Sequence, residues 1–364
     1  MLKPILECPV CNCSGFKSLY ALSSADVVQC TDCDLLYVPM PTPEVTSIYK
    51  ASYFKGDQEV HGYGNYEDEY ESHYKTFEHR IKETEMVMGG KGRVLDVGCA
   101  LGHFGKVAKD RGWDVFVTDV SDFAVQKSAI QYGLKGFVSS PDKLPVKPGQ
   151  FDCITLFDVI EHVSQPLELL QNMREALNRN GVLHLTTPNQ NSLSAKLMGK
   201  HWYHLKPEEH LLYFSPSTIK LALEKTGFEV IQLRPMATFM RVKDIFMRLR
   251  RYSKFIASAG LKISKMLGLD EKIIKIYVGE MEVWARPQRS EERKHVKVPH
   301  PVDVPQSSVF DVVCCPNCKS SIYKEEIQKT EEILCTNCDS SYEIVAGVID
   351  FSRYGKRNSR ARAV

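Results

Sequence analysis

The sequence predicts an α/β fold in which a parallel sheet is covered by helices on both faces. Short apolar, β-branched runs alternate with helical repeats from residue 93 onward, and this alternation is typical of buried parallel strands. The second observation is the distribution of the twelve cysteines, ten of which lie in two short terminal segments. We therefore expect a central α/β domain with a small cysteine-rich unit at each end.

The alternation assigns each element of the central domain in order. Strands are expected at 93–98, 113–121, 151–159, 182–189, 229–235 and 279–287, and helices at 103–112, 122–133, 166–181 and 217–228. One more helix is expected near the end of the segment 44–85, because this last part of the segment contains neither proline nor glycine.

Length and composition exclude several classes of protein. The 364 residues allow two or three domains, and 43% hydrophobic with 25% charged residues is typical of a globular protein. A net charge of +2 gives no overall field that would favour nucleic acid. No apolar run approaches the ~18 residues of a membrane span, and the N-terminus lacks the apolar stretch of a secretory signal. We therefore expect a cytoplasmic protein.

The terminal cysteines form paired CxxC turns, which present four thiolates to a zinc ion at about 2.3 Å. In a reducing compartment such pairs are better explained as metal ligands than as disulfides. Cys13 could take the place of Cys11 as a ligand, although the spacing favours Cys11. Cys314 is an additional cysteine in the second unit. Free buried thiols or redox pairs are the alternatives. The predicted structural Zn²⁺ ligands are Cys8, Cys11, Cys30 and Cys33 at one end, and Cys315, Cys318, Cys335 and Cys338 at the other.

A glycine-containing turn joins the first expected strand of the domain to its first helix. Glycines at such a turn let backbone amides approach a ligand closely. The dinucleotide-binding pattern GxGxxG fails here, because Ala100 and His103 occupy its second and third glycine positions. A Walker-type phosphate loop also fails, because no GK[ST] follows. The observed pattern is DxGxxxG over residues 96–102.

This pattern resembles motif I of class I S-adenosylmethionine-dependent methyltransferases. The resemblance extends over residues 86–285 and includes Asp119, the acidic residue that closes the second strand, the pair Leu144-Pro145, the segment 151–163, and the element 201–228. The element at residues 201–228 is similar to the broad methyltransferase group that also carries an N-terminal zinc ribbon. The resemblance implies a Rossmann-like, seven-stranded methyltransferase sheet with zinc ribbons at both termini, and S-adenosylmethionine as the cofactor.

The resemblance also implies roles for individual residues. Asp96 would orient the loop and meet the cofactor's amino group through water, while Asp119 would accept hydrogen bonds from both ribose hydroxyls. Ala100 replaces the usual middle glycine, and Ser140 stands where an aspartate often contacts adenine. The implied cofactor-binding residues are Asp96, Gly98, Gly102, Asp119, Val120, Ser140, Asp142, Leu144, Phe157 and Asp158.

Two histidines are candidates for proton transfer to and from the methyl acceptor. His162 follows the expected strand at 151–159, and His210 lies in the segment PEEHLLYF. Structural roles, in a hydrogen-bonding pair with Glu161 or a core contact, are the alternatives. The Asn/Asp-Pro-Pro-aromatic tetrapeptide of amino methyltransferases is absent after that strand. This absence favours oxygen or carbon acceptors.

The chain divides into six segments. They are an N-terminal zinc ribbon (1–40), a tyrosine-rich cap and helical segment (41–85), the methyltransferase core (86–286), a linker (287–308), a second ribbon (309–353) and a basic tail (354–364). The second ribbon resembles the zinc-ribbon family of tRNA-methyltransferase activator subunits.

Residues 236–275 form an unusual insertion in the core. They contain ten Lys or Arg and three Asp or Glu, a local net charge of +7, with apolar residues at helical spacing. A lid or an internally packed helix is favoured, and a peripheral membrane or polyanion contact is the alternative.

The predicted function is methyl transfer from S-adenosylmethionine to an oxygen or carbon of a small-molecule or carrier-linked, sugar-like acceptor. An RNA or protein methyltransferase assisted by its activator-like ribbon is the second hypothesis. A non-catalytic zinc-ribbon binding protein with a degenerate core is the third.

Overall fold

The computed structural model describes residues 5–40, 70–288 and 308–356, except residues 321, 323–331, 336, 339 and 346. Most of the tyrosine-rich cap, most of the linker and residues 357–364 of the basic tail therefore lie outside the described residues. Among the described helices, none combines the length and the hydropathy needed to cross a bilayer.

The predicted seven-stranded Rossmann-like sheet is confirmed. Its order is β10-β11-β8-β7-β4-β5-β6, with β11 antiparallel to both neighbours and the five strands from β8 to β6 parallel. The strands are β4 (Arg93–Val97), β5 (Asp114–Asp119), β6 (Lys135–Val138), β7 (Phe151–Phe157), β8 (Leu177–Pro188), β10 (Phe228–Arg241) and β11 (Ile273–Pro287). Strand β6 was not expected, and the helix expected at 166–181 ends at residue 176, where β8 replaces its last turn.

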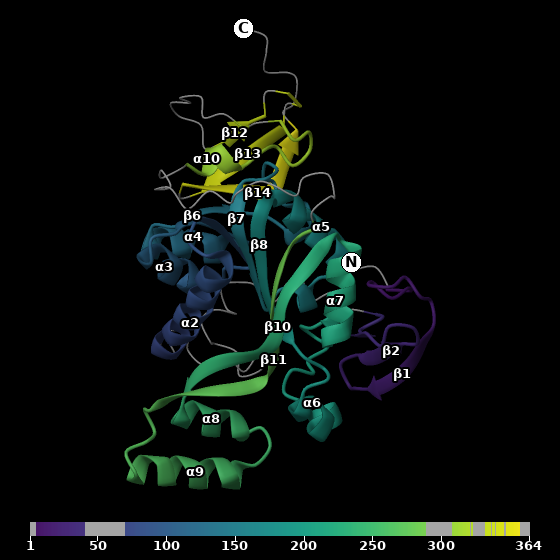
Figure 1. The fold of residues 1–364 in the computed structure, drawn as a ribbon, viewed down its shortest axis with the longest axis vertical. Coiled ribbons are helices and arrows are strands. Elements are labelled where there is room, and N and C mark those ends of the chain that lie inside the picture. Colours follow the sequence, from purple (N-terminus) through teal and green to yellow (C-terminus); the bar gives the residue numbers. More distant parts are fainter. Residues whose placement is uncertain are drawn as a thin grey trace.

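Helices cover both faces of the sheet (Figure 1). They are α2 (Tyr70–Met88), α3 (His103–Asp110), α4 (Asp122–Tyr132), α5 (Pro166–Ala176), α6 (Leu193–Met198) and α7 (Pro216–Lys225). Serine side chains begin three of them: Ser121 accepts a hydrogen bond from the Ala124 amide, Ser192 accepts one from the Ala195 amide, and Ser215 forms a capping box with Thr218.

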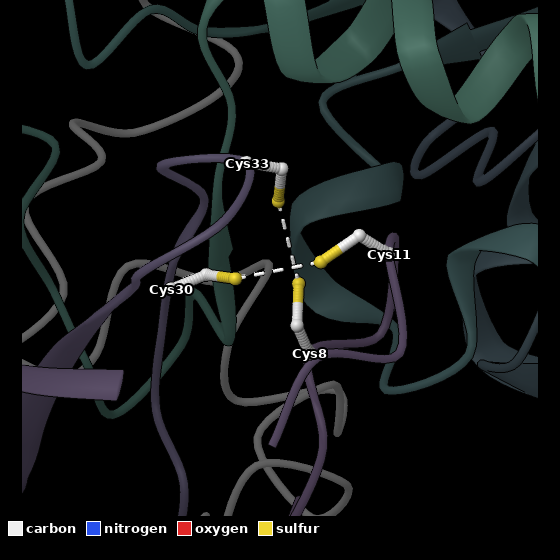
Figure 2. Close-up of side chains that lie close together, drawn as sticks. All are labelled: Cys8, Cys11, Cys30 and Cys33. Atoms are coloured by element: carbon white, nitrogen blue, oxygen red, sulfur yellow. Dashed lines mark hydrogen bonds between the residues drawn. The ribbon is translucent and has the colours of Figure 1, made fainter. Parts of the chain in front are cut away.

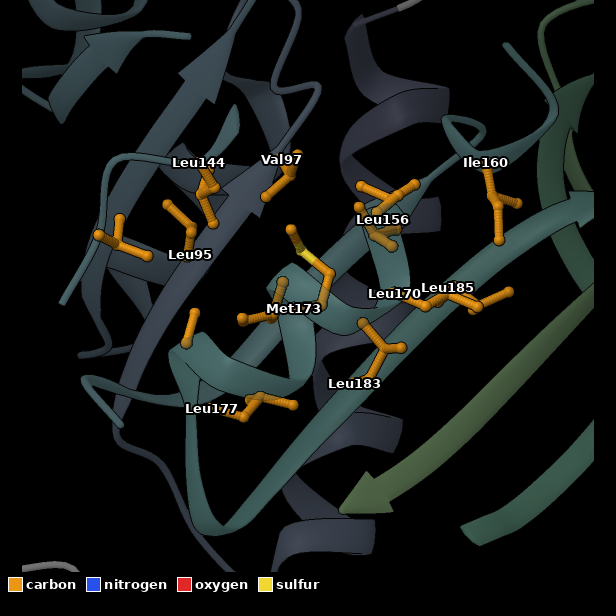
Figure 3. Packing of buried hydrophobic residues seen from close by; sticks show 14 of the residues in the cluster. Leu95, Val97, Leu144, Leu156, Ile160, Leu170, Met173, Leu177, Leu183 and Leu185 are labelled. Carbon is orange, nitrogen blue, oxygen red and sulfur yellow. The ribbon is translucent and has the colours of Figure 1, made fainter. Parts of the chain in front are cut away.

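Alternate residues of each central strand supply two separate cores, because successive side chains point to opposite faces. Leu95 and Ile154 pack under α5 and α7, while Val94 and Cys153 pack under α2 and α3. Figure 3 shows the first core, in which Met173 of α5 lies against leucines from β4, β7 and β8. The two faces fix the ends of β4, β5 and β7 relative to one another, and these ends carry the predicted cofactor residues.

The N-terminal unit joins the core through a small antiparallel sheet. Its strands are β1 (Phe16–Ala21), β2 (Asp26–Cys30) and β3 (Leu36–Tyr37). Strand β3 pairs with β9 (Leu212–Tyr213) of the core, with Leu36 opposite Tyr213. The second unit comprises α10 (Val309–Val312), β12 (Glu332–Leu334), β13 (Ser340–Val345) and β14 (Val348–Lys356).

The second unit extends the central sheet to ten strands, because β14 pairs in parallel with β6. Ile349 lies opposite Phe137, and the rings of Phe137 and Phe351 meet edge to face at 6.0 Å between centroids. The Cys314 amide also donates to the Pro145 carbonyl at 2.8 Å. Both cysteine-rich units are thus built into the body of the molecule (Figure 1).

The insertion is a long hairpin that carries two helices at its end. Strands β10 and β11 continue past the sheet to residue 241 and from residue 273, and α8 (Val242–Leu249) and α9 (Lys254–Met266) lie between them. The helices pack closely, because a Cβ on Gly260 of α9 would overlap the Phe246 ring of α8. Figure 1 shows this hairpin projecting away from the sheet.

Candidate active site

A cavity of about 530 Å³ lies at the carboxyl ends of β4, β5 and β7. Ligands bind at this edge in open parallel sheets. Helix α2 covers one side with His73, Thr76, Phe77 and Arg80, and the segment 203–211 covers another. Asp96, Gly98, Asp119, Val120, Ser140, Phe157, Asp158, His162 and His210 all line this cavity. The structure thus brings most of the predicted cofactor and catalytic residues to one place.

The loop after β4 takes a left-handed backbone at three of its positions. The φ angles are +77° at Gly98, +47° at Ala100 and +79° at Gly102. A left-handed backbone costs a residue with a Cβ about 1–2 kcal/mol, so Ala100 holds a strained conformation at the cavity. The Gly98 and Cys99 amides both donate to the Thr118 carbonyl, at 2.8 and 3.1 Å. These bonds fasten the loop to the end of β5.

Gly102 was expected among the cofactor-binding residues, but it does not line the cavity. A Cβ there would lie 2.5 Å from the Cβ of Ser128 on α4 and 3.0 Å from Leu134. Gly102 therefore permits the close approach of the loop to α4. Gly98 does line the cavity, and a Cβ on it would lie 2.5 Å from the Val159 side chain.

Asp119 ends β5 and holds the loop from the neighbouring strand. Its Oδ2 accepts a hydrogen bond from the Ala100 amide at 3.0 Å, and its Oδ1 accepts one from the Ser121 amide at 2.9 Å. Burial raises the pKa of the Asp119 carboxyl above its usual value, while these amides oppose the rise. Each carboxylate oxygen has a second lone pair, so Asp119 can also accept bonds from a ligand.

Asp96 and Arg80 bring opposite charges to the inner wall of the cavity. Asp96 accepts a hydrogen bond from Thr155 Oγ1 at 2.7 Å, and burial raises its pKa to about 7. The Arg80 guanidinium stacks over the Phe157 ring at 4.6 Å and is only 4% exposed. Its Nε has no hydrogen-bond partner among the described residues. Such a buried cation is suited to an anionic ligand group.

Sequence reasoning missed Arg80. The available signal was its spacing from His73, Thr76 and Phe77, which places all four on one face of the helix expected there.

The remaining predicted cofactor residues differ in their positions. Asp158 has a φ of +57°, and its Oδ1 accepts a bond from Thr186 Oγ1 at 2.9 Å. The Phe157 ring contacts Phe104 edge to face at 4.9 Å. Leu144 does not line the cavity and packs in the core under α5. The side chain of Asp142 lies outside the described part of the structure.

A cluster of imidazoles and carboxyls forms the opposite wall. The His162 and His210 rings are 4.8 Å apart between centroids and nearly perpendicular. His162 Nδ1 donates to the Glu209 carbonyl at 2.7 Å, and His210 Nδ1 donates to the His204 carbonyl at 2.9 Å. Because a carbonyl only accepts, each neutral ring carries its proton on Nδ1 and its lone pair on Nε2.

Burial sets the charges of this cluster. It lowers the pKa of His162 and, together with the neighbouring imidazoles, brings the pKa of His210 well below its usual value. It also raises the pKa of Glu280 to about 8 and that of Glu161 well above the ordinary range. Near pH 7 the imidazoles are therefore neutral and able to accept a proton. The donor atoms of Glu161, His162 and His210 lie within 4.8 Å of one another and could also hold a cation.

The insertion contributes to this wall as well. Arg248 of α8 lines the cavity and lies 5.8 Å from the centroid of the Tyr203 ring. Neither Arg248 nor Tyr203 was predicted.

The eight predicted metal ligands meet in two groups of four. Figure 2 shows the first group converging from two turns, with 3.5 Å between the sulfurs of Cys8 and Cys33 and 3.4 Å between those of Cys11 and Cys30. In the second group, the corresponding sulfur pairs Cys315–Cys338 and Cys318–Cys335 are both 3.5 Å apart. A tetrahedral zinc ion with bonds of about 2.3 Å separates its ligands by about 3.8 Å, so both groups fit zinc. Cys13 and Cys314 lie outside these groups.

Comparison with known proteins assigns a class to this site. Residues 71–233 match the model of a methyltransferase domain family. The ubiquinone biosynthesis O-methyltransferase of Thiobacillus denitrificans is 25% identical over 169 residues, which cover 43% of this chain and 72% of that protein. The tRNA U34 carboxymethyltransferase of Campylobacter jejuni is 29% identical over 153 residues, or 38% of this chain and 50% of that protein.

A SAM-dependent methyltransferase of Archaeoglobus fulgidus has a solved structure that aligns with a TM-score of 0.40 and 18% identity, covering 61% of this chain and 98% of that one. The domain match and the curated relatives identify residues 71–233 as a methyltransferase domain. The protein is an S-adenosylmethionine-dependent methyltransferase.

The packing of Gly102 leads to a first prediction. Gly102→Ala and Gly112→Ala both place a Cβ on a left-handed backbone, but nothing lies within 4 Å of the new Cβ at Gly112. Gly112→Ala should lower the free energy of unfolding by about 1–2 kcal/mol, and Gly102→Ala by about 1–3 kcal/mol more because of the overlap with Ser128. Denaturant unfolding measures both, and equal losses would contradict the packing role of Gly102.

Proposed function

We propose that the enzyme methylates an oxygen or a carbon of a small-molecule or carrier-linked, sugar-like acceptor. The observation that supports this proposal is the pair of neutral imidazoles, His162 and His210, in the same cavity as the glycine loop. A hydroxyl or an activated carbon must lose a proton to be methylated, and a neutral imidazole can take it.

The donor would lie across the ends of β4 and β5. Asp119 would bind the ribose hydroxyls, and the Arg80 guanidinium would pair with the methionine carboxylate. Asp96 would meet the amino group through water, and Phe157 would border the adenosyl region. In this arrangement Asp119 and Asp96 are already held in place by their own hydrogen bonds, and Arg80 is held by the Phe157 ring.

The reaction is an in-line displacement at the methyl carbon. The acceptor atom forms the new bond to carbon, the bond from carbon to sulfur breaks, and S-adenosylhomocysteine leaves as a neutral thioether. The acceptor's proton passes to His210 or His162. Alignment of the two reactants supplies most of the acceleration, since positioning is worth roughly 7–11 kcal/mol.

The names of the relatives point to two acceptor classes. An O-methyltransferase of ubiquinone biosynthesis agrees with an oxygen acceptor, which the buried imidazoles also favour. A tRNA-modifying relative supports the second candidate, an RNA substrate assisted by the activator-like ribbon. We favour the first, because the acceptor wall holds two neutral imidazoles that can take the proton a hydroxyl or an activated carbon must lose.

The test is to locate the methyl group. Incubation of the full chain with methyl-labelled S-adenosylmethionine and a cell extract should place the label in small or carrier-linked metabolites. His210→Gln should slow this labelling by about 10²–10⁴-fold while donor affinity stays unchanged, because only the proton acceptor is lost. His201→Gln, at an exposed position, is the matched control. Label in RNA or protein alone would overturn the acceptor assignment.

Replacement of Asp119 tests the donor site. Asp119→Ala should weaken S-adenosylmethionine binding by about 1–3 kcal/mol, because hydrogen bonds from the ribose to a charged group are lost. Asp122→Ala removes a carboxylate at the start of α4, outside the cavity lining, and should change the affinity by less than about 0.5 kcal/mol. Calorimetric titration gives both values. If the donor binds the Asp119 variant as tightly as the native chain, the ribose assignment fails.

We also propose that each group of four cysteines holds a structural Zn²⁺, and that the protein works in the reducing cytoplasm. Metal binding would supply folding free energy that units of this size cannot obtain from their own cores. Four thiolates complete the coordination of zinc, so no position remains for catalysis.

Metal analysis of cysteine variants tests the two zinc sites. The native chain should carry two equivalents of zinc, and Cys30→Ser or Cys335→Ser should each retain one. Cys13→Ser and Cys314→Ser are matched controls and should retain two, because their sulfurs lie outside the groups. Chelation should also lower the melting temperature. Retention of both equivalents by Cys30→Ser would rule out the first site.

A further inference from the structure

The end of the insertion hairpin exposes an unusual number of large apolar side chains. We define the α8–α9 tip as residues 242–272. Phe255 is 83% exposed, Met266 is 78% exposed, and Leu267 is 59% exposed. Ile256, Ile263 and Met247 are also more than half exposed. A concentration of this kind at a protruding end marks an interaction site.

These side chains share one side of α9. Residues 255, 259, 263 and 266 follow one another at intervals of three or four, so they lie in one stripe along the helix. Ala257, Gly260 and Ser264 are buried and form a separate face. A groove beside α8 continues the stripe, and Ser264 contributes its only polar side chain among the described lining residues. The fold of the tip therefore uses one face of α9 and leaves an apolar face uncovered.

Basic residues flank this apolar stripe. Lys254, Lys262 and Lys265 belong to the same helix and are exposed. Two of the three acidic residues of the insertion pair internally: Asp244 with Arg241, and Glu271 with Lys243 and Arg241. The tip thus combines an exposed apolar stripe with a strong excess of positive charge.

We propose that the α8–α9 tip docks on the surface of an anionic lipid bilayer. The apolar stripe would enter the boundary between headgroups and acyl chains, and the lysines would contact lipid phosphates. Neither contact requires a membrane-spanning segment. The proposal concerns a surface outside the cavity, so it stands or falls independently of the acceptor.

Two other occupants fit less well. A second copy docked by the same surface would bring together two tips that each carry a net charge of +5, and like charges oppose association. A nucleic acid would neutralise the lysines, but phosphates offer no burial for Ile263, Met266 and Leu267. A bilayer satisfies the charge and the apolar stripe together.

The tip is also connected to the active site. Helix α8 carries the exposed Met247 on the tip and, at the next residue, Arg248 in the wall of the cavity. Docking would therefore hold the acceptor wall close to the bilayer, where an acceptor on a lipid carrier would be found.

Vesicle sedimentation with the full chain tests the proposal. The chain should bind vesicles of equal parts phosphatidylglycerol and phosphatidylcholine at least about tenfold more tightly than vesicles of phosphatidylcholine alone, and added salt should weaken the binding. Replacement of Phe255 and Met266 together by serine should reduce binding to the anionic vesicles by about tenfold or more. Lys262→Glu with Lys265→Glu should do the same.

Ile130→Ser is the matched control, because Ile130 is 76% exposed on α4, away from the tip. It should leave vesicle binding unchanged, and all variants should bind S-adenosylmethionine as the native chain does. Absence of binding to anionic vesicles, or equal binding by the tip variants, overturns the proposal. So does a dimer, seen by light scattering, that the tip variants abolish, or binding of single-stranded RNA in place of vesicles.

Discussion

The hydrogen bond from the Ala100 amide to Asp119 ties the loop after β4 to the end of β5, and the rest of the site depends on this contact. The bond holds a non-glycine residue in a left-handed backbone and aims the same carboxylate into the cavity. Hydrogen bonds from the Gly98 and Cys99 amides to the Thr118 carbonyl also fasten this loop to β5. β4 and β5 must therefore be in register before S-adenosylmethionine can bind. The two hydrophobic cores, one on each face of the sheet, hold these strands in that register.

A second constraint governs the acceptor wall. Removing imidazoles and carboxyls from water favours their neutral forms, so the cluster of Glu161, His162, His210 and Glu280 carries little charge near pH 7. Backbone carbonyls then decide which nitrogen of each histidine keeps its proton. A positively charged sulfonium therefore enters beside neutral bases; Arg248 also lies on that wall, whereas Arg80 lies on the donor side.

Long, strongly patterned elements could be predicted from the sequence, and short or context-dependent ones could not. The alternation of apolar runs located β4, β5 and β7, whose ends carry the site. Strand β6 has four residues and contains Gly136, so it has neither the length nor the pattern of a strand, and only its pairing with β5 and β14 defines it. The helix before β8 ends early because Leu177 already pairs with Phe151 of β7. Arg248 reaches the cavity through tertiary packing alone, and the burial of Leu144 likewise follows from the way its segment meets α5.

The pairing of β14 with β6 has a consequence for the whole molecule. Without the C-terminal unit, β6 would be an outer strand with open backbone donors and acceptors, which invite another chain to add its own strand. The C-terminal unit therefore covers this edge of the sheet. Unfolding of this unit would expose the unpaired backbone of β6 and promote aggregation, even with the cavity intact.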